Sequence, residues 1–206
     1  MSRVRVAVLV AVLGTVPFLG AAPAAAGEPA PRSPVTVNRY DHVVADFGAQ
    51  PREGVSVAAL LDAFRFTDEN GQPAATAGMH ADITVDGAGY VCELDAPAEV
   101  GVARDLATAD LTTSLAGECG GPAGTQPFSL RAEVTLVATG ALEERREVIR
   151  TDSGICVQRF RERPAAASGT AWIRFGDVLD ETVAIGAGPT QRIEHVDEVC
   201  VTTPDL

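Results

Sequence analysis

Hydrophobic alternation with a period of two is the feature that most limits what this chain can fold into. Between Met79 and Val85, between Ala107 and Leu115, and again between Phe128 and Ala138, mainly apolar residues occupy every second position. Successive side chains of a β-strand point to opposite faces, so this pattern is typical of strands with one buried and one exposed face. The chain is therefore predicted to form antiparallel sheet.

Turn-forming Gly and Pro residues separate about eight or nine such segments between residues 35 and 206. Residues 55–66 are ambiguous, because Val57, Leu60, Leu61 and Phe64 have helical spacing whereas the end of the segment alternates. Residues 164–169 are predicted to form a hairpin loop. We expect one all-β domain at residues 35–206, an antiparallel β-sandwich or barrel-like fold of about eight strands with at most one short helix. The abundance of Ala and Val favours the sandwich, with a thin core.

The N-terminus has the three-part layout of a secretory signal peptide. Arg3 and Arg5 form a basic start, residues 6–16 are almost unbroken apolar sequence, and small residues precede Gly27. The apolar run is shorter than the roughly 20 residues that cross a bilayer. We expect a Sec-type signal peptide at residues 1–26, cleavage after Ala26, secretion without membrane insertion, and a flexible Pro-rich leader at residues 27–34.

The chain contains four cysteines, Cys92, Cys119, Cys156 and Cys200. An even number of cysteines in an exported chain predicts disulfides. Three pairings are possible, and we favour Cys92–Cys119 with Cys156–Cys200 because each closes a moderate loop between neighbouring strand segments. The cysteines lack the Cys-x-x-Cys spacing of zinc sites, and we expect no metal or cofactor.

The chain is acidic, with 28 Asp and Glu residues against 16 basic residues. All 16 basic residues are Arg, which is typical of GC-rich coding sequence and indicates a high-GC bacterium. Removal of the signal peptide leaves 14 Arg against the 28 acidic residues, a formal charge of −14. This balance argues against nucleic acid and against anionic membrane surfaces as partners.

The arginines are concentrated between residues 131 and 163, where glutamates interleave with them. One interpretation is an exposed sheet face with cross-strand ion pairs. The other is a recognition face, because the Arg guanidinium binds carboxylates through two hydrogen bonds. The candidate recognition residues are Arg145, Arg150, Arg159, Arg161 and Arg163.

Catalytic and metal-binding patterns are weak. Asp152-Ser153-Gly154 resembles the tripeptide around the nucleophile of chymotrypsin-like serine proteases, with His42 earlier in the chain. The glycines that flank that tripeptide in the family, and that shape its oxyanion hole, are replaced by Thr151 and Ile155.

Two His–Asp pairs are candidate zinc ligands, provided that the fold brings them together: His80 with Asp82, and His195 with Asp197. We expect neither a catalytic nor a metal site.

These observations predict a secreted, non-catalytic β protein that binds an unidentified extracellular protein, a glycan or a cell-envelope component. Two alternatives remain open. In the first alternative, the protein is a small extracellular hydrolase whose site is assembled from distant residues. In the second, it is a protease inhibitor whose exposed loop is the hairpin at residues 161–169.

Overall fold

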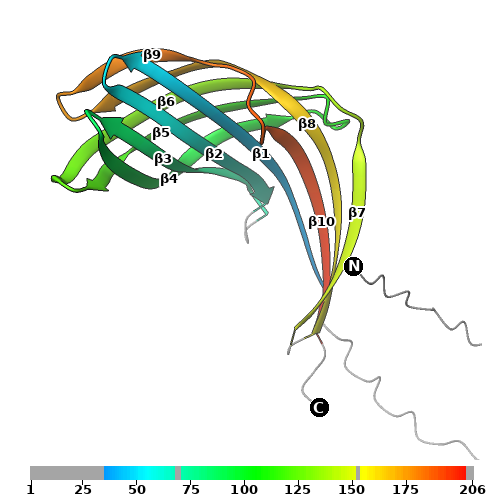
Figure 1. The fold of residues 1–206 in the computed structure, drawn as a ribbon. Coiled ribbons are helices and arrows are strands. Elements are labelled where there is room, and N and C mark those ends of the chain that lie inside the picture. The colour runs from blue at the N-terminus through cyan, green and yellow to red at the C-terminus, as the bar shows by residue number, and fades with distance from the viewer. Residues whose placement is uncertain (1–34, 68–70, 152–153, 203–206) are drawn as a thin grey trace, which may run out of the picture. The chain divides into compact units, whose positions relative to one another are not determined.

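The computed structural model describes residues 35–67, 71–151 and 154–202, which form one ten-stranded antiparallel sheet (Figure 1). The predicted signal peptide and leader lie outside the described residues. The strands are β1 (Val35–Arg52), β2 (Val55–Thr67), β3 (Pro73–Val85), β4 (Ala88–Val102), β5 (Thr108–Gly121), β6 (Gly124–Ala138), β7 (Glu143–Thr151), β8 (Gly154–Phe175), β9 (Leu179–Ile185) and β10 (Arg192–Thr202).

The all-β prediction is confirmed, and the ambiguous segment at residues 55–66 is part of strand β2. The described part of the chain contains no helix long and apolar enough to cross a membrane.

The strand pairings form a closed circuit. Strands β1 to β6 pair in chain order, β6 pairs with β8, β8 pairs with β10, and β10 pairs with β1. This single antiparallel sheet is consistent with the predicted sandwich or barrel-like fold. Strands β2 to β6 each have a hydrogen-bonded strand on both sides, and β9 pairs only with β8 among the described residues.

The prediction of a hairpin loop at residues 164–169 is wrong, because these residues continue strand β8. Pro164 lies where β8 exchanges neighbours: residues up to Pro164 pair with β10, and residues from Ala165 onward pair with β6. A proline lacks a backbone N–H and is tolerated where the ladder is interrupted. The exposed inhibitor loop that we considered is therefore not present.

The core consists of the inward-facing residues of the closed circuit. Leu61, Ile83, Leu130 and Ile173 are fully buried. Alanine is common among the buried residues, which fits the low aromatic content of the chain. The alternation in the sequence therefore does mark the buried face of each strand.

Both disulfides that the sequence analysis favoured are present. Cys92–Cys119 joins β4 to β5 within the core, where both residues are fully buried. Cys156–Cys200 joins β8 to β10 at directly facing positions of the two strands. Both bonds cross-link neighbouring strands, and both fit an oxidising compartment.

Gly169 allows two strands to approach closely inside the circuit. Its φ is +151°, and a Cβ atom built on it would lie 2.0 Å from the carbonyl oxygen of Glu133 on β6. Backbone at this distance cannot yield as a flexible side chain can. The residue at this position must therefore be glycine.

We expect Gly169→Ala to lower the free energy of unfolding by about 1–3 kcal/mol, the usual cost of an overpacked site. Chemical denaturation followed by circular dichroism measures the change. Gly101→Ala is the matched control, because nothing lies within 4 Å of the Cβ that it adds. Equal stability of the two variants would contradict the steric argument.

Candidate binding surface

Four strand segments lie side by side at one end of the sheet, as Figure 1 shows for β7, β8, β10 and β1, and the β8–β10 and β10–β1 pairings among them complete the circuit. We call them the arm: strand β7, residues 154–164 of β8, strand β10 and residues 35–43 of β1. The register aligns residues across all four strands. Arg146 faces Arg159, Arg159 faces Asp197, and Asp197 faces Arg39. Residues aligned in this way point to the same face of the sheet.

The two faces of the arm carry opposite charge. The face that continues the lining of the closed circuit, which we call the arginine face, has six arginines and three carboxylates. The other, outer face has two arginines and five glutamates. The arginine face therefore has a formal excess of three positive charges in a chain whose net charge is −12.

An exposed apolar patch lies on the arginine face, toward the end of the arm. We call it the valine patch, and its residues are Val35, Val37, Val148, Ile155, Val157, Val199 and Val201. Six of them have exposed fractions between 39% and 60%, and they make up six of the ten exposed large hydrophobic residues in the described ranges. A contiguous exposed patch of this kind marks an interaction site more often than scattered apolar residues do.

Salt bridges organise the charged rows beside the patch. The Arg39 Nε lies 2.9 Å from the Asp197 Oδ1, and the His195 Nδ1 lies 2.8 Å from the Asp41 Oδ1. Arg65 on β2 also donates to Asp41 through its Nε, at 2.9 Å. The Arg161 Nε lies 3.6 Å from the Glu144 Oε1, so all three carboxylates of the face have a partner within the molecule.

Three arginines of the arginine face are exposed and can bind a carboxylate of another molecule. Arg146, Arg150 and Arg159 are exposed and form no salt bridge with any residue in the described ranges. A guanidinium without a partner carboxylate can bind one from another molecule.

The predicted recognition residues are divided between the two faces. Arg150, Arg159, Arg161 and Arg163 lie on the arginine face, and Arg145 points to the outer face. Arg163 is half-buried, and its Nη1 donates to the Gly140 carbonyl at 3.4 Å. Arg161 is also half-buried, and its Nε lies 3.6 Å from the Glu144 Oε1. Arg150 and Arg159 are therefore the predicted residues that are exposed on this face without a carboxylate partner in the described ranges.

Sequence reasoning missed Arg39, Arg146 and the valine patch. The alternation of Val35 with Val37 and of Val199 with Val201 was the signal that could have indicated the patch. The chain offered no local signal that these two segments pair with each other, since they lie at opposite ends of the domain.

The outer face is organised around His42, which is buried. Its Nε2 lies 3.0 Å from the Asp62 Oδ1, and its Nδ1 lies 3.2 Å from the Glu194 Oε2. The imidazole stacks on the Phe64 ring at a centroid distance of 4.3 Å. Arg145 completes the cluster, 3.8 Å from Glu194 and 4.1 Å above the Phe160 ring.

The contacts of His42 change two pKa values. Burial by itself lowers the pKa of His42, but hydrogen bonds to Asp62 and Glu194 outweigh it, so that the pKa is raised above its ordinary value. The hydrogen bond to His42 lowers the pKa of Glu194, against the opposing effect of burial. Both ring nitrogens face carboxylates, so the protonated imidazole is an ion-pair partner rather than an accessible base.

The weaker sequence patterns are not assembled into sites. Asp152 and Ser153 of the protease-like tripeptide lie outside the described residues. The two His–Asp pairs lie on β3 and β10, which are not neighbours in the sheet. Cys156, Glu198 and Cys200 form the one metal-ligand-type group found in the described ranges, and the disulfide between the two cysteines leaves no thiolate for a metal.

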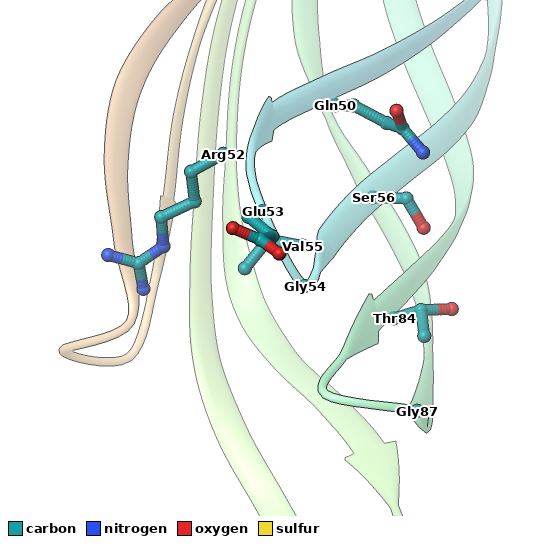
Figure 2. Close-up of a pocket in the computed structure, with 8 residues that line it drawn as sticks. All are labelled: Gln50, Arg52, Glu53, Gly54, Val55, Ser56, Thr84 and Gly87. Carbon is teal, nitrogen blue, oxygen red and sulfur yellow. The ribbon is translucent and has the colours of Figure 1, made fainter.

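An open pocket lies near the turn between β1 and β2 (Figure 2). Its lining includes one carboxylate, Glu53, and two hydroxyl groups, those of Ser56 and Thr84. Figure 2 shows the Arg52 side chain directed away from both hydroxyls, and its Nη2 donates to the carbonyl of Val178. The residues lining this pocket include no histidine that could activate a hydroxyl.

Comparisons with known proteins assign no family to the chain: no family model, no curated protein and no solved structure matches it.

The His42 cluster predicts a maximum of stability at mildly acidic pH. A raised pKa of His42 stabilises the fold fully below about pH 6.5, the ordinary value, and this contribution is lost as the pH rises through the folded-state pKa. A lowered pKa of Glu194 stabilises the fold above about pH 4.5, and this contribution is lost as the pH falls through the folded-state pKa. We therefore expect the free energy of unfolding to be highest between these two values.

Denaturation at a series of pH values tests this expectation. In His42→Gln the dependence on pH should be flatter on both sides of the maximum, because the variant removes the ion-pair partner of Glu194. His80→Gln is the control, since the His80 side chain is 51% exposed and its nearest carboxylates lie 3.6 and 3.7 Å away. A His42→Gln curve parallel to that of the unmodified protein would refute the assignment.

Proposed function

We propose that this protein is a secreted, non-catalytic binding protein whose partner is an extracellular protein or a protein component of the cell envelope. The observation that carries the proposal is the valine patch, which lies in register on four strands beside unpaired arginines. Protein interfaces combine an apolar centre with arginine, and carboxylate groups of a partner are natural ligands for those arginines. A glycan offers less apolar surface to such a patch.

Other features support the location and the mode of action. Two disulfides suit a protein that works outside the cytoplasm, in agreement with the signal peptide predicted at residues 1–26. The Arg39–Asp197 salt bridge and the hydrogen bond between His195 and Asp41 hold the charged rows in place before a partner arrives. Such preorganisation reduces the entropy that binding costs.

The test replaces valines inside and outside the patch in the mature protein, residues 27–206. Val37→Asp combined with Val199→Asp places two carboxylates in the patch, and we expect at least a tenfold loss of affinity, about 1.4 kcal/mol. Val91→Asp combined with Val137→Asp is the matched control, because these valines are 47% and 50% exposed outside the arm.

Each immobilised protein is used to capture components of the medium and envelope of the source bacterium. The dissociation constant of each identified component is then measured by calorimetry, after circular dichroism has shown that the variants fold. Equal affinity of the patch variant and the unmodified protein would reject the arm as the binding surface.

A further inference from the structure

Strand β7 is an open edge of the sheet. It pairs with β8 along nine positions and with no other strand in the described ranges. All of its residues are exposed. The backbone N–H and C=O groups on the far side of such a strand can form a ladder with one more strand, which is a common way for a protein to bind an extended peptide.

We propose that β7 accepts an extended segment of the partner protein as an added strand, and that the segment carries an acidic, an apolar and an acidic residue at alternate positions. The proposal rests on the proposed binding function and names the chemistry of the partner. The three positions derive from the residues that β7 presents on the arginine face, Arg146, Val148 and Arg150.

Cross-strand pairing determines which side chains of the added strand fit beside these three residues. Directly opposed side chains in neighbouring strands lie about 4.5–5.5 Å apart, and opposite charges or apolar pairs at this distance are stabilising. A carboxylate thus suits the position beside Arg146, an aliphatic side chain the position beside Val148, and a carboxylate the position beside Arg150. The pattern reads the same in both directions, so it holds for parallel and antiparallel addition.

A carboxylate of the added strand gains the most at the position beside Arg146. Arg146 lies directly opposite Arg159 on β8. Like charges at facing positions destabilise a sheet. A partner carboxylate at the edge relieves this repulsion, and the neighbouring apolar side chain extends the row that Val148 and Val157 begin.

A second copy of this chain is a poorer occupant of the edge. In an antiparallel pair of two β7 strands related by a two-fold axis, centring on Arg146 or on Glu147 places that residue opposite its own copy. Centring on Val148 places Arg146 opposite Arg150. Each of these registers opposes like charges, whereas the register centred on Ile149 opposes none but pairs only residues 147–151. The sequence of β7 thus disfavours self-pairing along most of the strand and leaves the edge to a different segment.

The test uses a labelled synthetic peptide, Thr-Glu-Thr-Ile-Thr-Glu-Thr, and the mature protein at low ionic strength. We expect binding that is detectable by fluorescence anisotropy, and slower amide hydrogen exchange in β7 when the peptide is bound. A peptide with Lys in place of both Glu should bind at least tenfold more weakly. Equal binding of the two peptides, or no binding of either, would overturn the proposal.

Variants of the protein locate the peptide. Arg146→Glu combined with Arg150→Glu should weaken binding of the acidic peptide at least tenfold. Arg131→Glu combined with Arg174→Glu is the matched control, with the same change of charge on exposed arginines of β6 and β8 outside the arm. A further control, Arg145→Glu, changes the neighbouring residue on the outer face of β7 and should affect the peptide less than Arg146→Glu.

The two proposals fail in different ways. If the natural partner is lost from the Val37→Asp and Val199→Asp variant but the peptide does not bind, the binding surface stands and strand addition is rejected. If sedimentation shows that the unmodified protein dimerises and that the Arg146→Glu and Arg150→Glu variant is monomeric, a second copy occupies the edge and the inference is likewise overturned.

Discussion

The hydrogen-bond ladders along both edges of strand β8 hold the molecule together. Residues 165–175 pair with β6, residues 169–175 pair also with β9, and residues 154–164 lie between β7 and β10, although β7 ends opposite residue 162. Because one uninterrupted strand serves both regions, the register of the closed circuit fixes that of the arm. Arg159 and Arg161 must share a face with Ala165 and Ala167, which are buried in the core. The face that lines the core thus continues into solvent, where its apolar residues are no longer covered.

The two faces of the arm then have different roles. On the outer face the ionic groups are used within the molecule: His42 of β1 joins Glu194 of β10 to Asp62 of β2, and Arg145 covers Phe160. Ion pairs and stacking of this kind connect the base of the arm to the closed circuit. On the arginine face, Arg146, Arg150 and Arg159 have no carboxylate partner in the described ranges, and the apolar residues of the valine patch are exposed. Stabilisation from the outer face therefore leaves the arginine face free for the partner that we propose.

Patterns that depend on local structure could be predicted from the sequence, and patterns that depend on strand order could not. Alternation predicted the strands at Met79–Val85 and Phe128–Ala138, and the loop lengths favoured the correct disulfides. Pro164 was a misleading turn signal, because the exchange of strand neighbours at this position tolerates proline. The partners of His42 lie 20 and 152 residues away, a separation that no local pattern reports. The arginine cluster indicated the arm, but the assignment of Arg145 to the opposite face required the register.

The Cys156–Cys200 disulfide explains how an arm with one exposed apolar face can hold its shape. The bond lies on the outer face. Along the two strands it is flanked by two facing pairs of the valine patch, Val157 with Val199 and Ile155 with Val201, whose side chains point to the arginine face. A sheet with little buried apolar surface opens readily, and its edges fray first. A covalent link between the two central strands prevents slippage of their register, because a slip of one residue would move the valines to the other face. The valine patch and the rows of arginine are thus fixed relative to each other. For the binding function that we propose, such a preordered surface lowers the entropic cost of forming the complex.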